Sequence, residues 1–157
     1  MTRRFWAPGR VNLIGEYTDL AGGLALPVAI DLGVTLTVEP ADAFDIRSRD
    51  GDLAGSLDAV LAEVPDAEPV RGELTSTLPV GAGLSSSAAV HVALTLALTG
   101  LTDMELALAA QRAEHRALGV PSGILDQAAS ALGRDGHAVL LDFAALGHEL
   151  VPLPPGL

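Results

Sequence analysis

The sequence predicts an α+β fold, in which one layer of helices covers one face of a mixed, mostly antiparallel sheet. Short segments with the two-residue period of strands fill the first third, and longer apolar segments with helical period follow from the middle onward. With 157 residues, 49% of them hydrophobic and 18% charged, the chain suits one domain with a substantial core and excludes a disordered segment.

The first third of the chain is predicted to be rich in strands. Residues Phe5–Val11 and Gly33–Val38 have the composition of strands, and Phe44–Arg49 alternates between apolar and polar side chains. Gly22 and Gly23 mark a tight turn between the first two strands.

In the middle of the chain, the sequence predicts an acidic, variable segment, then a strand and a buried helix. The stretch Arg49–Val70 contains two prolines and leaves room only for a short helix near Ser56–Val64. Alternating residues then lead from Gly72 to Pro79, and a helix follows from about Ser85. Because this helix is apolar nearly all round, we expect it to be buried.

The last third predicts two helices and a strand. Thr102 and Glu105 have the spacing of a capping box, and Gly119 is a typical helix end, so a helix is predicted between them. A short helix is predicted to open at Ser122 and close at Gly133, and residues His137–Phe143 read as a strand.

Composition excludes several classes of function. The formal net charge is −11 and every basic residue is an arginine, so the chain has no basic stripe of the kind that binds nucleic acid. The chain has no cysteine, which removes disulfides and thiolate chemistry and favours a reducing compartment. It also has no apolar run of the length of a membrane span and no signal-peptide core at its start, so a cytoplasmic protein that binds no membrane is expected.

The segment PVGAGLSSSAAV, at Pro79–Val90, is the first candidate site. Its glycines permit a tight backbone turn, and the helix that follows aims free N–H groups and its positive end at one point. This pattern favours an anion cradle, in which a serine hydroxyl also suits Mg²⁺. A glycine turn with a serine N-cap fits the same residues equally well. A P-loop is excluded because the chain contains no lysine.

The segment Ala7–Pro27 is the second candidate site, because donors and acceptors suited to sugar hydroxyls or phosphate cluster in it. These side chains are Arg10, Asn12, Glu16, Tyr17 and Asp19. Taken alone, a solvated loop after a strand explains them as well.

The segment Gln111–Gln127 is the third candidate site. Helical spacing puts Glu114 on the core side of its helix, where a buried carboxylate needs a cation. Asp126 falls in the first turn of the next helix, where the helix dipole favours a carboxylate. In the alternative interpretation, Asp126 is only a first-turn acid and Glu114 pairs with Arg112 or Arg116 at the rim. The four histidines lack ligand spacing and are interpreted as structural.

Together these three segments resemble the motifs of the GHMP kinase family, and specifically of its galactokinase branch. APGRVNLIGEYTD resembles the signature of the sugar site, LPVGAGLSSSAAV is similar to the nucleotide-phosphate loop, and GVPSGILDQ resembles the segment with the catalytic aspartate. The order agrees, and the resemblance covers essentially the whole chain. It implies the fold of domain 2 of ribosomal protein S5, as found in the N-terminal domain of these kinases.

The resemblance also implies roles for individual residues. Asp126 would take or orient the proton of the sugar's anomeric hydroxyl, with Arg10 beside it to steady the transferred phosphoryl charge. Ser87 and Glu114 would hold Mg²⁺ on the ATP phosphates. Glu16, Tyr17 and Asp19 would line the sugar site, where Gly123 allows close approach. The residues implied in nucleotide binding are Pro79, Gly81, Ala82, Gly83, Leu84, Ser85, Ser86 and Ser87.

The implied activity is ATP-dependent phosphorylation of galactose to galactose 1-phosphate. The chain has Tyr17 where the family usually has histidine, which keeps a kinase for arabinose, a uronic acid or N-acetylgalactosamine as an alternative. A silent sensor of sugar and ATP is a further alternative. Residues 1–157 would form the N-terminal domain, and the second domain, absent from this chain, would come from a longer protein or a partner chain.

Overall fold

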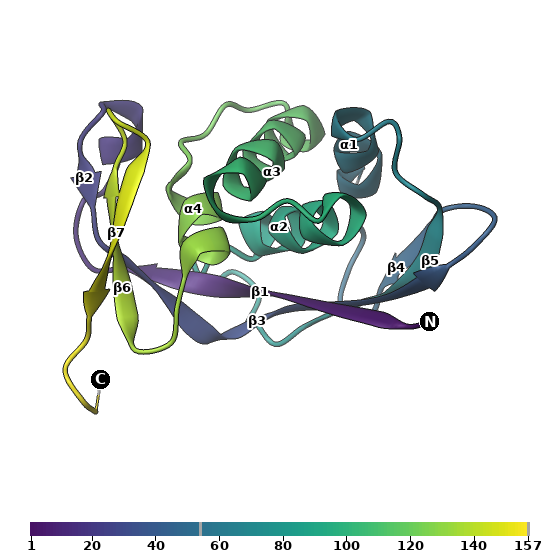
Figure 1. The fold of residues 1–157 in the computed structure, drawn as a ribbon, viewed down its shortest axis with the longest axis horizontal. Helices are drawn as coiled ribbons and strands as arrows, with labels where there is room; N and C mark the ends of the chain where they lie inside the picture. The colour runs from purple at the N-terminus through teal and green to yellow at the C-terminus, as the bar shows by residue number, and fades with distance from the viewer. Residues whose placement is uncertain (54, 157) are drawn as a thin grey trace.

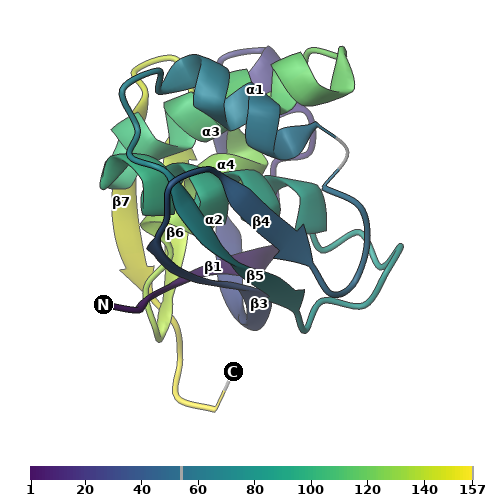
Figure 2. The same ribbon diagram turned by 90° about the vertical axis from the view of Figure 1, so that its right-hand side faces the viewer.

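The computed structural model describes residues 1–53 and 55–156 (Figure 1). A four-stranded sheet extends along the molecule, four helices cover one of its faces, and a smaller sheet stands at one end. Figure 2 shows the same layers from the side, with the helices above the larger sheet. The predicted α+β class, with helices on one face of the larger sheet, is confirmed.

The larger sheet has the strand order β1-β3-β5-β4. Its strands are β1 (Arg3–Asn12), β3 (Pro27–Pro40), β5 (Val70–Ser76) and β4 (Asp45–Ser48). The β1/β3 and β3/β5 pairs are antiparallel, whereas β4/β5 is parallel. Leu36 pairs with Phe5 on one side and with Leu74 on the other, so the register puts apolar residues in one row under the helices.

The helical layer consists of α1 (Ser56–Glu63), α2 (Ser86–Thr99), α3 (Asp103–Leu118) and α4 (Leu125–Leu132). Helix α2 lies closest to the sheet, and its Val92, Ala93 and Leu94 are buried against strand residues of the main core. The prediction of a buried helix here is confirmed. No helix in the described residues is long and apolar enough to cross a membrane; α2 and α3 meet that test only as a pair, bent by 116°.

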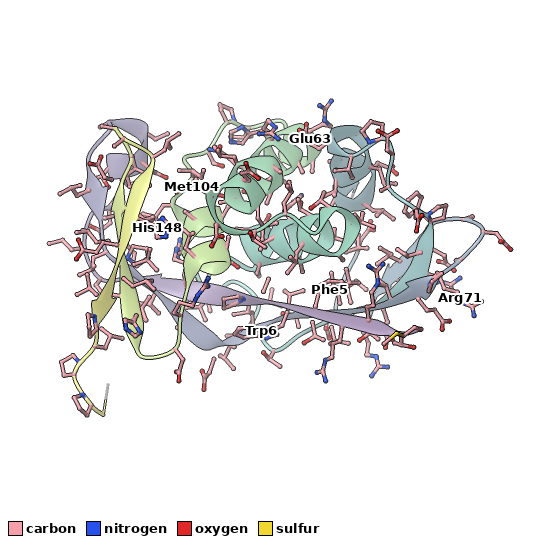
Figure 3. The ribbon with its side chains drawn as sticks, in the orientation of Figure 1. Phe5, Trp6, Glu63, Arg71, Met104 and His148 are labelled. Carbon is pink, nitrogen blue, oxygen red and sulfur yellow. The ribbon has the colours of Figure 1, made fainter. Side chains whose placement is uncertain are left out.

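The two faces of the larger sheet differ in their cover. Figure 3 shows Phe5 on the side of the helices and its neighbour Trp6 on the opposite side of β1. Phe5 packs against the main core, whereas Trp6 is 48% exposed. At Phe5 and Trp6 the alternation therefore buries one face of β1 and exposes the other, whereas Ala7, Pro8 and Gly9 are all buried.

The second sheet has the order β2-β6-β7 and is antiparallel throughout. Its strands are β2 (Leu24–Ala25), β6 (His137–Asp142) and β7 (Gly147–Pro152), and a 3-10 turn, η1 (Thr18–Leu20), precedes β2. Val139 of β6 belongs to a second core cluster, together with Ile124 and Leu132 at the two ends of α4. The prediction of a single sheet was wrong in this respect, since the last strands pair with each other and with β2.

The predicted start of the fourth helix at Ser122 was wrong, because α4 begins at Leu125. The backbone of Ser122 is held by α3 instead: its N–H donates to His115 Nε2 at 2.9 Å, and its carbonyl accepts from Gln111 Nε2 at 3.0 Å. These bonds fix the preceding segment in a non-helical path, and they give His115 the structural role expected of it.

Other predicted boundaries hold in part. Gly119 ends α3 in the left-handed conformation, as predicted. The capping box before α3 does not form, since the Thr102 hydroxyl donates to Asp103 and no side chain caps the helix. The strand predicted to reach Pro79 ends at Ser76.

Glu63 at the end of α1 ties that helix to α3. Its carboxylate accepts from Arg112 Nε at 2.7 Å and from Arg116 Nη2 at 3.0 Å, and Figure 3 shows Glu63 between the two helices. The hydrogen bond from Arg112 lowers the pKa of Glu63 below its ordinary value. The ion pairs therefore stabilise the protein fully at pH values above the ordinary pKa of glutamate. This contribution to stability is lost as the pH falls through the lowered pKa.

We therefore expect Glu63→Gln to destabilise the protein by up to about 1 kcal/mol at pH 7, since both guanidinium groups are more than half exposed. At pH values below the ordinary pKa of glutamate, the difference in Tm between this variant and the wild type should become smaller. Thermal unfolding from pH 7 to pH 3 measures it, with the exposed Glu68→Gln as control. A loss that stays constant over this range would contradict the pairing.

Candidate functional site

Arg10 connects the first motif to the other two. It lies on β1 just after an irregularity in the pairing with β3, between Pro8 and Arg10. Its Nε and Nη2 contact Asp126 Oδ1 at 2.7 and 2.6 Å, and its Nη1 donates to the Gly83 carbonyl at 3.0 Å. One guanidinium group thus binds both the glycine loop and the first turn of α4.

The loop before α2 has the backbone expected of a cradle. Gly81 and Gly83 have φ of 73° and 69°, in the left-handed region that glycine adopts without strain. Ser85, the residue before α2, also has a positive φ, and no side chain caps the helix. The alternative of a serine hydroxyl that caps α2 was therefore wrong, and the first N–H groups of the helix have no side-chain partner at the N-cap.

Asp126 is the meeting point of the three motifs. It lies in the first turn of α4, as predicted, and its side chain is 35% exposed. Arg10 holds its Oδ1, and the Ser85 hydroxyl donates to its Oδ2 at 2.5 Å. Since a strand and a loop from the two other motifs both supply contacts to this carboxylate, it is more than a first-turn acid.

Glu114 is buried, as its helical position predicted, with 7% of its surface exposed. The Ser87 hydroxyl donates to its Oε1 at 2.5 Å, and the side-chain amide of Gln127 donates to its Oε2. The alternative in which Glu114 pairs with Arg112 or Arg116 was wrong, because both arginines bind Glu63.

The Glu114 carboxylate has no charged partner in the described part of the chain. The nearest basic group is His91, whose Nδ1 is 3.9 Å from Oε1. Burial lowers the pKa of His91, which favours the neutral ring, and its Nδ1 lies 2.9 Å from the Ser87 carbonyl, to which it can only donate. A nearly buried carboxylate surrounded by neutral donors is a place where a cation stabilises the site.

A pocket of about 600 Å³ opens beside these groups. Its polar lining includes Arg10, Glu114 and Asp126 together with the predicted sugar-site residues Glu16, Tyr17, Asp19 and Gly123. Leu20, Leu118 and Val120 form an exposed apolar part of its wall. The pocket lining includes none of the residues from Pro79 to Ser87. Residues 79–85 form a mostly exposed loop next to Arg10 and Asp126, and Ser86 and Ser87 begin α2.

Gly123 makes room for Asp19. A Cβ atom at position 123 would lie 1.7 Å from Asp19 Oδ2, which is closer than any packed atom can approach. The same carboxylate accepts from the N–H of Leu125 at 3.2 Å. The close approach expected at Gly123 is therefore made by the chain's own Asp19, which is bound to the start of α4.

We expect Gly123→Ala to displace the Asp19 carboxylate and detach η1 from α4. The variant should lose about 1 kcal/mol of stability, the typical contribution of the Leu125–Asp19 hydrogen bond that is broken, and the pocket should change shape. Thermal unfolding measures this, with Gly147→Ala as control, because an added Cβ there has nothing within 4 Å. Equal Tm values for the two variants would contradict the close contact.

Gln127 was not singled out as a site residue by the sequence. It is wholly buried, lines the pocket and binds Glu114, and its Oε1 has no partner among the described residues. The sequence did contain one signal for Gln127: it is a long polar side chain in a short helix, near the apolar residues Leu125 and Ala128. A buried amide in such a setting needs a polar partner.

Comparison with known proteins gives the family. A family model described as the GHMP kinases N-terminal domain matches residues 53–134, just over half of the chain. The chain belongs to the GHMP kinase family. A second model, the galactokinase galactose-binding signature, matches residues 3–40, which contain Arg10 and the predicted sugar-site acids. The resemblance inferred from the three motifs is confirmed.

Individual members of the GHMP family support the galactokinase branch. The galactokinases of Chloroflexus aggregans and Thermococcus kodakarensis are 38% and 35% identical to this chain over 99% and 98% of its length. The crystal structure of Lactococcus lactis galactokinase complexed with galactose superposes with a TM-score of 0.88 at 27% identity, over 98% of this chain and 47% of that one. The chain spans about half the length of the curated relatives it matches.

Proposed function

We propose that this chain is the sugar- and ATP-binding half of a galactokinase, which transfers the γ-phosphoryl group of ATP to the anomeric hydroxyl of galactose. The single observation that carries the proposal is the position of Asp126 at the edge of the pocket, bound by Arg10 from one motif and by Ser85 from another. The galactokinase signature over residues 3–40 supports the choice of sugar.

The proposed reaction uses a base and fixed positive charge. Asp126 accepts the proton as the anomeric oxygen attacks the γ-phosphorus, the bond to the β-phosphate oxygen breaks, and ADP leaves. Arg10 holds Asp126 in position and provides positive charge near the transferred group. Positioning and charge stabilisation account for most of the catalysis of phosphoryl transfer, and these residues supply both.

The glycine loop is proposed to bind the ATP phosphates through backbone N–H groups and the Ser86 hydroxyl, and through the Ser85 hydroxyl once it turns from Asp126, to which it donates its one proton here. The residues also fit a Mg²⁺ ion: Ser87 and Glu114 present adjacent hard oxygen atoms, and the buried carboxylate has no charged partner in the described residues. No group of three or more histidine, cysteine or acidic residues in the described chain forms a metal site. Mg²⁺ bound here would share its coordination with phosphate oxygens and neutralise their charge.

Tyr17 favours a second candidate within the same reaction class. It lines the pocket, has a positive φ of 59° and is 81% exposed. A phenol at this position differs from the imidazole usual in the family in size and in hydrogen bonding. A kinase for another sugar, such as arabinose, a uronic acid or N-acetylgalactosamine, is therefore the alternative.

A coupled assay of ADP release over a panel of these sugars tests the proposal on the complete encoded protein. We expect galactose to give the highest kcat/KM. Turnover of another sugar without turnover of galactose would replace the galactokinase proposal by the alternative, and binding of ATP and sugar without any turnover would indicate a sensor.

We also propose that residues 1–157 act together with a second domain, since the curated relatives are about twice as long as this chain. Sequencing the reading frame beyond residue 157 tests this directly. A cytoplasmic location is part of the same proposal and is checked by cell fractionation.

A further inference from the structure

Gln127 and Asp126 are consecutive residues that serve two different parts of the site. Asp126 is bound by Arg10 and Ser85, whereas Gln127 extends into the helix layer and binds Glu114. The first turn of α4 therefore connects the proposed base with the proposed metal carboxylate. A shift of this turn would move both groups.

The Gln127 amide determines the position of the Glu114 carboxylate. Its Nε2 donates to Oε2, which leaves Oε1 directed at the Ser87 hydroxyl. Gln127 is fully buried, and its Oε1 has no partner among the described residues, so its one described hydrogen bond is the bond to Glu114. A buried amide that leaves its own oxygen unpaired while fixing a carboxylate is poorly explained by stability alone.

We propose that Gln127 is a positioning residue, which holds Glu114 in the conformation that binds the divalent cation and so sets the dependence of nucleotide binding on Mg²⁺. The inference rests on the proposed function, in which Glu114 and Ser87 hold that ion. Groups that orient a metal ligand through a hydrogen bond change metal affinity by about 10- to 100-fold when they are removed. Gln127 has this relation to Glu114 through its one described hydrogen bond.

The test compares ADP affinity with and without Mg²⁺ in the complete encoded protein, by calorimetry. In Gln127→Met and Gln127→Leu, the buried volume is kept and the donor is lost. We expect the Mg²⁺-induced gain in ADP affinity to fall by about 10-fold or more, with ADP affinity in the absence of Mg²⁺ unchanged. The Mg²⁺ concentration that gives half-maximal activity should rise in parallel, while the KM for sugar stays constant.

Ser130→Ala is the matched control. Ser130 lies one turn further along α4, is buried, and has a hydroxyl without a partner among the described residues, so its loss perturbs the same helix away from Glu114. A purely structural effect of either substitution would change Tm, in whichever direction, without a change in Mg²⁺ dependence. A wild-type dependence on Mg²⁺ in either folded Gln127 variant would overturn the inference. Failure of the proposed function is distinguishable, because the wild type itself would then show no turnover and no effect of Mg²⁺ on ADP.

Discussion

Asp126→Asn abolishes phosphoryl transfer and leaves ATP binding intact, if Asp126 is the proton acceptor. Asparagine has the same shape and can still accept a hydrogen bond from Arg10 or Ser85, but it cannot take the proton of the attacking hydroxyl. A positioned base contributes about 10²- to 10⁴-fold to such reactions, so kcat should fall by that factor or more. Steady-state kinetics and ATP titration of the complete encoded protein measure the two quantities.

Asp103→Asn is the control for this change. Asp103 is also a first-turn aspartate, on α3, and it pairs with Arg134 on the surface. Its replacement alters the same charge at a helix start without touching the pocket, and we expect wild-type kcat. Retention of most of the activity in Asp126→Asn would exclude Asp126 as the base.

Glu114→Gln has opposite effects on activity and on stability. The change removes the only charge from the cluster of Ser87, Gln127 and Glu114, so the proposed Mg²⁺ site loses its anionic ligand and kcat/KM for the Mg²⁺ complex of ATP should fall by at least about 100-fold. Stability without Mg²⁺ should rise by about 1 kcal/mol, or about 3 °C in Tm, because a buried carboxylate without a charged partner in the described chain becomes neutral.

Kinetics and thermal unfolding in EDTA test the two effects separately. The exposed Glu105→Gln, also on α3, controls for the change in net charge and should leave both quantities near their wild-type values. A fall in both activity and Tm would mean that Glu114 is held by structural contacts alone, and would contradict a cation site.

Much of the fold follows from local patterns in the chain. The buried helix α2 was predicted because apolar side chains surround it, and the end of α3 at Gly119 because glycine adopts the left-handed conformation found there. Strands β2 and β7 were not predicted. The first has only two residues, and the second is a largely exposed strand without clear alternation, so their pairing depends on contacts with β6 that no local pattern contains.

For the site, too, the sequence predicted which segments take part but not which residues bind one another. The motifs predicted which segments supply Arg10, Glu114 and Asp126, and the structure brings all three to one pocket. Their exact partners depend on distances across the fold: Ser85 binds Asp126 instead of capping α2, and Asp19 occupies the space that Gly123 leaves free. Gln127 left a local signal as a polar side chain among apolar neighbours, but its partner Glu114 could be recognised only once α3 and α4 were seen side by side.

Trp6 on β1 and Tyr17 at the pocket also provide separate optical reporters. The chain contains one tryptophan and one tyrosine. Trp6 lies half exposed on the open face of the larger sheet, on the strand that carries Arg10, while Tyr17 borders the pocket. Tryptophan emission therefore reports the folding of the sheet from a solvent-facing position, and the tyrosine absorbance difference reports occupation of the pocket, without interference from a second residue of either kind.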